Sequence, residues 1–496
     1  MKYILAIDQG TTSTRAIIID HNQKVIKSAQ KEVKNYFPHE GYVLQDPNEI
    51  WLSTLSVIQE LFYDEQIDVK DIISIGISNQ RETTIMWDKT TGKPIYDAIV
   101  WQSRQSSEIV KRYKDAGYED FIKEKTGLIL DSYFSVTKIK WIFENVEGAR
   151  ENENLLFGTV DTWLLYKLTN GKVHATDVTN ASRTCLMNIK TLKWDEELLK
   201  LFDIPEYILP EIKNTADDFG RVEEYYLFSN PCPINALVGD QQAALFGESC
   251  FKRGESKNTY GTGGFLLINT GDDIVNSKNG LLSTVAWSLS DKIKDENISN
   301  LSYALEGSIF VSGSLIQWLR DGLRIIQSAK QTEEIAKSLK DNGGVYIIPS
   351  FTGMGAPHWN EKAKGAIFGL TRGSDYRYLV RASLEAMAYQ VKDLIDAIEN
   401  DIDFGIDSLK VDGGASENNF LLQFQSDILG IDVIRNENKE STALGAARLA
   451  GLYCNYFSMD DFRSDKLSTF SPKLSKDNAK QLYDKWLYYL NKNLDD

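Results

Sequence analysis

The sequence predicts an α/β protein in which two domains face each other across a central cleft. The chain of 496 residues is long enough for two domains of ordinary size, and strand-like and helix-like segments alternate along it. Each half of the chain begins with a hairpin whose turn is rich in glycine and threonine, at residues 10–14 and 261–264. The two similar turns indicate two related domains, which we place at residues 1–251 and 252–496.

The first half predicts a β-meander followed by a helix and a further strand. Short apolar runs bounded by polar residues predict the strands, and apolar residues at helical spacing after a proline predict the helix. The segment 234–249 then predicts a strand, an acidic turn at Asp240 and a second helix. The predicted strands of the meander and the one after the helix are 3–9, 14–24, 24–33 and 72–80, and the predicted helix is 47–64.

The second half repeats this theme with two more glycine-rich turns. Residues 257–271 predict a hairpin around the turn "GTGG", and residues 408–429 predict a strand, a Gly-Gly turn and an amphipathic helix. A single turn of this kind is explained by glycine's tolerance of positive φ. Three such turns in two domains favour a shared binding function.

Composition and charge exclude several classes of protein. Apolar residues make up 42% and charged residues 25% of the chain, as in ordinary globular proteins. The net charge of −16 argues against nucleic acid and anionic lipid as partners. No apolar run approaches the ~20 residues of a membrane span, and the start shows no signal peptide, so we expect a cytoplasmic protein. The widely spaced Cys185, Cys232, Cys250 and Cys454 are expected to be reduced thiols, and no histidine clusters with them as a zinc site.

The first turn combines the features that a bound phosphate chain requires. Gly10 permits close approach of the backbone, and the hydroxyls and amides after it supply hydrogen-bond donors. Arg15 adds positive charge, and Asp8 at the end of the preceding strand offers the oxygen ligand that Mg²⁺ prefers. A hydrated hairpin turn has the same composition, so the turn alone does not decide. The hydroxyl residues are Thr11, Thr12 and Ser13.

Signatures of other nucleotide-binding folds are missing from the sequence. It contains no G-x-x-x-x-G-K-[ST] motif and no G-x-G-x-x-G after a strand. It also lacks the H-R-D and D-F-G motifs of protein kinases. P-loop, dinucleotide-binding and protein-kinase folds are therefore disfavoured.

Several motifs together resemble those of the FGGY family of carbohydrate kinases, which includes kinases of glycerol, xylulose and gluconate. They are "DQGTTSTRA", "SNQRETT", "TDVTNASRT", "GDQQAALFG", "YGTGGF", "ALEGSIFVSGSLIQWLRD" and "VDGGASENNFLLQFQSDIL". They occur in family order and cover almost the whole chain. The resemblance implies two actin/hexokinase-like (ribonuclease H-like) domains around a cleft. It also implies the use of ATP and Mg²⁺ to phosphorylate glycerol to sn-glycerol 3-phosphate, and assembly as a homodimer or homotetramer.

Arg81 and Glu82 are the candidate polyol-binding pair. The guanidinium donates hydrogen bonds in a planar fork and the carboxylate accepts them, so the pair is suited to binding adjacent hydroxyls. Two adjacent residues of opposite charge are also typical of a surface ion pair, so the residues alone leave both interpretations open. By resemblance the pair contacts glycerol. The resemblance assigns further contacts to Tyr133, Asp240 and Gln241, and an apolar wall to Trp101 and Phe265.

Asp240 precedes a predicted helix, where an acidic residue most often serves as an N-cap. The resemblance instead makes it the general base that accepts the proton of the attacking hydroxyl, and we expect the helix N-terminus to keep it ionised. The resemblance also assigns a set of nucleotide contacts. They are Thr11, Thr12, Ser13, Arg15, Thr262, Gly313, Gln317, Gly414 and Asn418, with Asp8 near the metal.

One segment departs from regulated members of the family, and two other functions stay open. Residues 219–242 contain no histidine and no Gly-Gly pair. We therefore expect neither inhibition by fructose 1,6-bisphosphate nor activation by histidine phosphorylation. The alternatives are a kinase of another small polyol, such as erythritol or dihydroxyacetone, and a non-enzymatic actin-like regulator or filament subunit.

Overall fold

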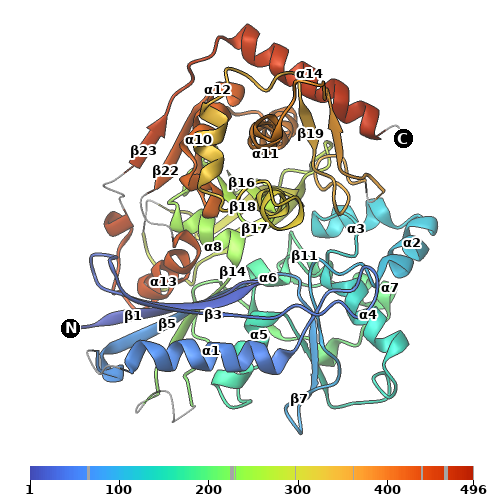
Figure 1. Cartoon of the computed structure of the whole chain (residues 1–496). Coiled ribbons are helices and arrows are strands. Elements are labelled where there is room, and N and C mark those ends of the chain that lie inside the picture. Colours follow the sequence, from blue (N-terminus) through green and yellow to red (C-terminus); the bar gives the residue numbers. More distant parts are fainter. Residues whose placement is uncertain are drawn as a thin grey trace.

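Two large sheets form the framework of the protein (Figure 1). The structure is a computed structural model and describes residues 1–63, 67–223, 228, 231–295, 298–360, 362–436, 440–462 and 467–494. The first sheet has five strands in the order β14-β5-β1-β2-β3, and the second has seven in the order β17-β18-β16-β15-β21-β22-β23. The predicted α/β class with two sheet-based domains is thereby confirmed.

The first sheet contains the predicted meander. β1 pairs with β2 antiparallel and with β5 parallel, so that Asp8 lies between Arg15 and Ser78. β14 extends the sheet parallel to β5. The bounds are β1 Tyr3–Gln9, β2 Ser13–Ile19, β3 Val25–Glu32, β5 Ile72–Asn79 and β14 Ile234–Gly239.

The second sheet follows the same plan. β15 and β16 form an antiparallel hairpin around the second Gly-Thr turn, and β15 pairs in parallel with β21. Both predicted hairpins therefore exist, and each is joined by a parallel strand. The bounds are β15 Ser256–Tyr260, β16 Gly264–Gly271, β17 Leu282–Ser288, β18 Leu301–Ile309, β21 Ser408–Asp412, β22 Asp432–Asn436 and β23 Leu467–Phe470.

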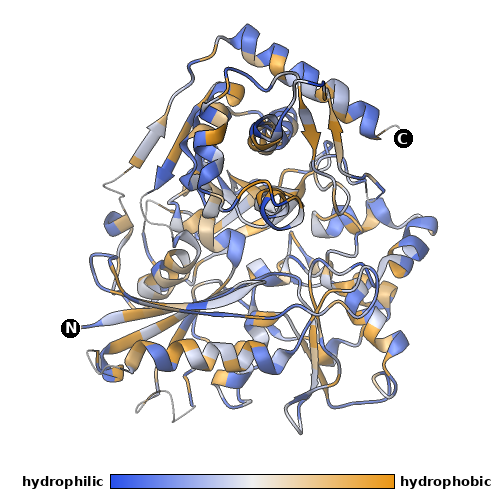
Figure 2. Cartoon of the chain, viewed as in Figure 1, coloured by the Kyte–Doolittle hydropathy of each residue, from blue (hydrophilic) through white to orange (hydrophobic). Residues whose placement is uncertain are grey.

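Helices cover both sheets, and their sequences show why each forms. α1 (Pro47–Phe62) starts at a proline after Asp46, whose side chain accepts a hydrogen bond from the Asn48 amide as an N-cap. Hydrophobic and hydrophilic residues alternate around α1 and α14, as expected for helices with one buried face (Figure 2). On the second sheet, α11 Tyr376–Asp401 and α12 Asn419–Leu429 pack directly on the strands, and α9 Gly313–Gln317, α10 Gln331–Lys337 and α14 Lys476–Leu494 pack against these two helices.

Smaller elements make up the chain segment that connects β5 to β14. The helices are α2 Ser107–Asp115, α3 Glu119–Thr126, α4 Ser135–Asn145, α5 Val160–Leu168, α6 Val178–Ala181 and α7 Glu196–Phe202. Short strands accompany them, including β6 Ile85–Asp88, β9 Leu155–Gly158 and β10 Ala175–Asp177. Within the described ranges, no helix combines the length and the apolar character needed to cross a bilayer.

The two sheets are joined through a close crossing of α8 (Asp240–Gly247) and α13 (Ser441–Tyr453), which lie between them (Figure 1). A Cβ atom on Gly445 would lie 1.9 Å from the Ala243 carbonyl oxygen, and one on Gly247 would lie 1.9 Å from that of Ser441. Only glycine permits this approach. α13 also packs on β1, β5 and β14, although it follows the predicted domain boundary at residue 251 in the sequence. That boundary stays a prediction.

Candidate functional site

The residues predicted to contact the polyol converge on one cavity of about 420 Å³ between the two sheet systems. Four predicted nucleotide contacts line the same cavity: Thr11, Thr12, Thr262 and Gln317. The cavity thus combines the first Gly-Thr turn, the second Gly-Thr turn and the predicted acceptor site. The polyol contacts that line it are Arg81, Glu82, Trp101, Tyr133, Asp240, Gln241 and Phe265.

The other predicted contacts lie outside that lining. Arg15 forms an ion pair with Glu440 and donates to Gln30, whose amide also donates to Ser13 Oγ at 2.9 Å. The remaining three have structural positions: the Gly313 amide donates to the Gly261 carbonyl at 2.9 Å, Gly414 is exposed, and Asn418 caps α12. Their roles in nucleotide binding stay predictions.

Arg81 and Glu82 are buried, with exposed fractions of 2% and 1%, so they are not the surface ion pair that the sequence left open. They also do not pair with each other. Arg81 holds Glu306 in a fork, with Nη1 to Oε2 at 2.5 Å and Nη2 to Oε1 at 3.0 Å, and its Nε lies 3.2 Å from Asp240 Oδ1. Glu82 instead accepts from Arg183 Nε at 2.6 Å. Arg81 and Glu82 are therefore each held by a separate partner.

Charge compensation makes this buried network tolerable. Burial alone would raise the pKa of Glu306, but Arg183 and Arg81 outweigh burial and hold that pKa at about 2. For Glu82 the balance is opposite, because burial raises its pKa despite Arg183 and Arg81. Buried ion pairs of this kind seldom add much net stability, so their presence next to a cavity indicates a functional arrangement.

Asp240 directly follows β14, and the predicted turn between strand and helix is absent. Gly239 occupies the N-cap position and Asp240 is the first residue of α8, so the N-cap interpretation is wrong. We expected the helix N-terminus to govern its ionisation. Burial is instead the largest influence and raises the pKa of Asp240, while the nearby charges of Arg81 and Lys257 oppose that rise.

Lys257 on β15 fixes the orientation of Gln241. Its ammonium group is fully buried and donates to Gln241 Oε1 and, at 2.9 Å, to Thr259 Oγ1. Because an ammonium group only donates, the amide oxygen of Gln241 must face it, which leaves Nε2 as the group available to the cavity. Burial lowers the pKa of Lys257 to about 8, and Asp412 and Asp240 limit the decrease.

Trp101 and Phe265, the residues predicted to form the apolar wall, lie together with Tyr133. The Trp101 ring lies 5.6 Å from that of Tyr133 and 5.8 Å from that of Phe265, both in edge-to-face geometry. Trp101 Nε1 also donates to Thr11 Oγ1 at 2.8 Å. The wall of the acceptor site is thus tied directly to the first Gly-Thr turn.

Asp8 at the end of β1 is suited to a magnesium ion held mainly by phosphate oxygens and water. Burial raises its pKa to about 7, while Ser78 donates to Oδ1 at 2.9 Å and the charge of Asp240 adds to the rise. Among the residues that the structure describes, no three His, Cys, Asp or Glu side chains form a metal-ligand group. Mg²⁺ commonly binds through one or two carboxylates plus substrate phosphates, so a half-buried carboxylate at the end of β1, two residues before Gly10 of the first Gly-Thr turn, fits it.

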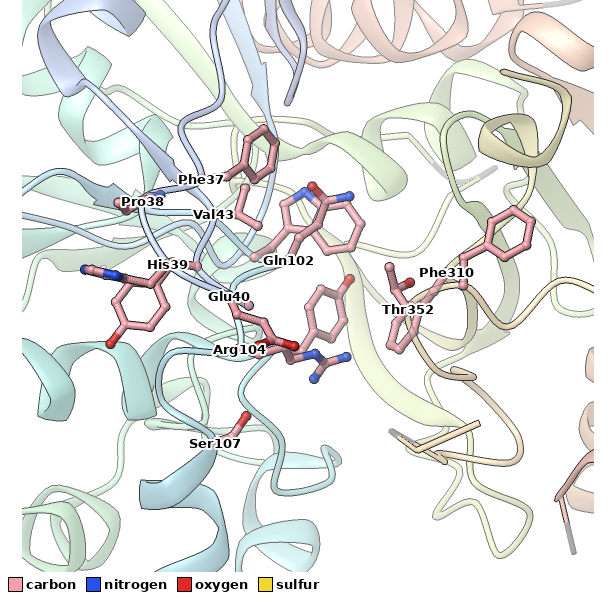
Figure 3. A pocket seen from close by; sticks show the side chains of 15 residues that line it. Phe37, Pro38, His39, Glu40, Val43, Gln102, Arg104, Ser107, Phe310 and Thr352 are labelled. Atoms are coloured by element: carbon pink, nitrogen blue, oxygen red, sulfur yellow. The ribbon is translucent and has the colours of Figure 1, made fainter. Parts of the chain in front are cut away.

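A wider groove of about 930 Å³ borders the site and shares Trp101, Gln102 and Tyr133 with it. Figure 3 shows residues of the segment 37–43 on one side and Phe310 and Thr352 on the other. The groove therefore separates the N-terminal part of the chain from loops of the C-terminal part.

Sequence reasoning missed three buried charged residues behind the cavity: Arg183, Lys257 and Glu306. Arg183 and Glu306 lie in motifs that carried the resemblance, and Lys257 lies three residues before one, but no role was assigned to them. Glu306 and Lys257 stand within strands that are otherwise apolar or uncharged, "YALEGSIFV" and "SKNTY". An ionisable residue inside a buried strand is the signal that identifies such groups.

Comparison with known proteins finds relatives over nearly the whole chain. The model of the FGGY family of carbohydrate kinases matches at residues 3–247 for the N-terminal domain and 256–454 for the C-terminal domain. The chain is 52% identical over 491 residues to a glycerol kinase of Staphylococcus epidermidis, covering 98% of this chain and 97% of that protein. A glycerol kinase of Oceanobacillus iheyensis is 51% identical over the same shares.

Solved structures show the same architecture. The crystal structure of a Plasmodium falciparum glycerol kinase with ADP superimposes with a TM-score of 0.89 at 35% identity, covering 100% of this chain and 98% of that one. A xylulose kinase of Lactobacillus acidophilus shares the fold, with a TM-score of 0.86 at 21% identity over 99% of this chain and 98% of that one. On the family match and the relatives' identity over nearly the whole length, the chain belongs to the FGGY family of carbohydrate kinases.

Proposed function

We propose that this chain is a glycerol kinase, which transfers the γ-phosphoryl group of ATP to glycerol and forms sn-glycerol 3-phosphate. The observation that carries the proposal is the convergence of all seven predicted acceptor contacts on one cavity, together with Thr11, Thr12 and Thr262 from the two Gly-Thr turns. Support comes from relatives named glycerol kinase at 52% and 51% identity, and from a structural relative solved with ADP.

In this proposal glycerol is bound by donors and acceptors that the fold has already fixed. Arg81 donates to adjacent hydroxyls, Glu82 accepts from them, and Gln241 offers its Nε2 amide. Tyr133 adds a phenolic hydroxyl, while the rings of Trp101 and Phe265 cover the carbon chain. The aromatic wall also excludes water, which limits wasteful hydrolysis of ATP.

The nucleotide phosphates would bind at the two Gly-Thr turns, with Thr11, Thr12 and Thr262 facing the cavity. Ser13, Arg15, Gly313, Gln317, Gly414 and Asn418 would contact the rest of the nucleotide or support those turns. Asp8 would hold Mg²⁺, which supplies positive charge to the phosphates. Closing the two domains would bring the acceptor hydroxyl to the γ-phosphate.

Asp240 would act as the general base. Its carboxylate lies beside Arg81, so the group that orients the acceptor also orients the base. Phosphoryl transfer passes through a loose transition state, in which positioning and charge neutralisation matter more than early removal of the proton. A carboxylate of modest basicity is sufficient to take up the proton as the new bond to phosphorus forms.

Release of ADP from ATP and Mg²⁺, measured across glycerol, erythritol and dihydroxyacetone, tests the proposed function. Glycerol is expected to give the highest kcat/KM of the panel. A higher kcat/KM with another polyol would show that this polyol, and not glycerol, is the acceptor. If no polyol causes release of ADP, the non-enzymatic actin-like alternative is favoured. The buried Arg81 and Glu82 beside the half-buried Asp240 argue against that alternative, because a regulator has no need of a polyol-binding pair.

The magnesium requirement is expected to depend on pH through Asp8. Because its pKa is raised to about 7, a proton competes with the cation below that pH, and more Mg²⁺ is needed for half-maximal ADP release. Titrations of Mg²⁺ at about pH 6 and about pH 8 measure this shift. The Asp8→Asn variant is the control for protonation of ATP itself. An equal shift in wild type and variant would contradict the role of Asp8.

Three further features stay predictions. We expect a homodimer or homotetramer, which light scattering measures, and a cytoplasmic location. Residues 224–227 and 229–230, within the segment expected to lack regulation by fructose 1,6-bisphosphate or histidine phosphorylation, lie outside the described residues. Activity assays with and without the bisphosphate test that expectation directly.

A further inference from the structure

We propose that Arg183 is a positioning residue for the acceptor site, which sets the orientation and charge of Glu82 and, through Glu306, the orientation of Arg81. The inference rests on the proposed function, because it concerns how the polyol-binding groups are held. Arg183 and Glu306 lie behind the cavity rather than in its lining, and both have exposed fractions of 0%. Their influence on an acceptor therefore passes through the residues in front of them.

Behind the cavity, Arg183 contacts the side chains of Glu82, Glu306 and Tyr133. Its Nε donates to Glu82 Oε1 at 2.6 Å, and its Nη2 donates to Glu306 Oε1 at 2.9 Å. The guanidinium carbon also lies 5.6 Å from the ring centre of Tyr133 and 5.4 Å from that of Phe134. A planar guanidinium is suited to making directed hydrogen bonds and a ring contact at the same time.

The contact with Glu82 has two consequences for the acceptor. One carboxylate oxygen of Glu82, Oε1, accepts a hydrogen bond from Arg183, which leaves the other oxygen available to the cavity. The positive charge also favours the ionised form of Glu82, because burial raises the pKa of Glu82 and Arg183 is the strongest influence that opposes this rise. An ionised Glu82 accepts hydrogen bonds from two hydroxyls, whereas a protonated one presents a donor in place of an acceptor.

Glu306 extends this arrangement across the domain border. It stands on β18 of the second sheet, while Arg81 follows β5 of the first sheet and Arg183 follows α6. Its Oε1 accepts from Arg81 Nη2 at 3.0 Å and from Arg183 Nη2 at 2.9 Å, so one carboxylate fixes the spacing of two guanidinium groups. The acceptor site is therefore held by both domains.

The network is not arranged for stability alone. Within the described part of the chain, the buried Nη1 group of Arg183 has no hydrogen-bond partner. An unsatisfied buried donor lowers stability, and buried ion pairs are often replaceable by apolar residues without loss of stability. Two arginines and two glutamates at this depth are better explained by what they hold in place.

A double-mutant cycle between Arg183 and Glu82 tests the proposal. Arg183→Lys keeps the charge but not the planar fork, and we expect it to raise the KM for glycerol about tenfold while the KM for ATP changes by less than about twofold. Glu82→Gln removes one of the two carboxylates through which Arg183 acts and leaves the route through Glu306. In the double variant, Arg183→Lys should therefore raise the KM for glycerol by a clearly smaller factor than it does in the wild type. Fully multiplicative effects, or an unchanged glycerol KM in Arg183→Lys, would overturn the proposal.

Matched variants separate positioning from loss of the fold. Arg112 donates to both carboxylate oxygens of Glu144 on the exposed surface, so Arg112→Lys also disrupts a guanidinium–carboxylate contact but should leave both KM values unchanged. If Arg183→Lys does not fold, Glu306→Gln takes its place. A rise confined to the KM for glycerol then supports the proposal, and equal changes in the KM for glycerol and the KM for ATP contradict it. Lack of glycerol phosphorylation by the wild type would instead contradict the proposed function itself.

Discussion

Asp240→Asn is expected to leave the fold and ATP binding intact while lowering glycerol turnover by about 10²- to 10⁴-fold, the usual contribution of a general base. Asparagine has the same shape as aspartate. It also retains an acceptor oxygen for the backbone N–H of Gln241, which donates to Asp240 Oδ1 at 2.7 Å. It lacks the negative charge that takes up the proton and balances Arg81. The loss should therefore fall on kcat, with little change in the KM for ATP.

Turnover is measured by coupled ADP release, nucleotide binding by calorimetry, and the fold by thermal unfolding. The matched control is Asp484→Asn, which removes an exposed carboxylate paired with Lys480 on α14, far from the cavity in sequence and on the outer surface. It should behave like the wild type. Near-normal turnover in Asp240→Asn would show that another group accepts the proton.

Arg81→Ala is expected to raise the KM for glycerol about 100-fold and the KM for ATP far less, because one or two hydrogen bonds to a charged donor contribute about 1.5–3 kcal/mol each. The guanidinium lines the acceptor cavity and lies 3.2 Å from Asp240, so its loss also leaves the base less well placed. A fall in kcat should accompany the rise in KM.

The same variant should lower stability, because Glu306 then keeps only one of its two guanidinium partners. Breaking a buried ion pair costs about 3–5 kcal/mol when no other partner compensates, and Arg183 reduces that cost here. Arg81→Lys distinguishes the two effects: it restores charge and hence much of the stability, but not the fork that faces the polyol. Equal changes in both KM values would show that Arg81 is structural.

Local features of the fold were predictable because their causes lie within short stretches of sequence. The strands 3–9 and 72–80 and the helix from residue 47 appear almost where the apolar patterns placed them. Both Gly-Thr turns connect antiparallel strands, as a small flexible residue between two apolar runs predicts. The error at Asp240, where a turn was expected, arose because a polar residue after a strand also suits the first turn of a helix.

The acceptor site was predicted from the resemblance rather than from the residues alone. Without it, Arg81 and Glu82 were as consistent with a surface pair as with a polyol site, because burial cannot be deduced from two adjacent charges. The partners that bury them come from positions 101 and 225 residues away in the chain. No local pattern connects such positions, so Arg183 and Glu306 had no assigned role.

The sequence by itself determined the α/β class, the two Gly-Thr turns and the chemical types of the acceptor residues, since these depend on local backbone preferences and on recognisable motifs. Only the tertiary structure decided that burial is the largest influence on the pKa of Asp240, and that Lys257 fixes the orientation of the Gln241 side-chain amide. It also decided that groups from both domains hold Arg81 and Glu82 in place. The physical reason is that pKa values and hydrogen-bond geometry depend on the groups that surround a side chain in space. In this protein the surrounding groups come from β15, β18 and the segment after α6, which meet only in the folded chain.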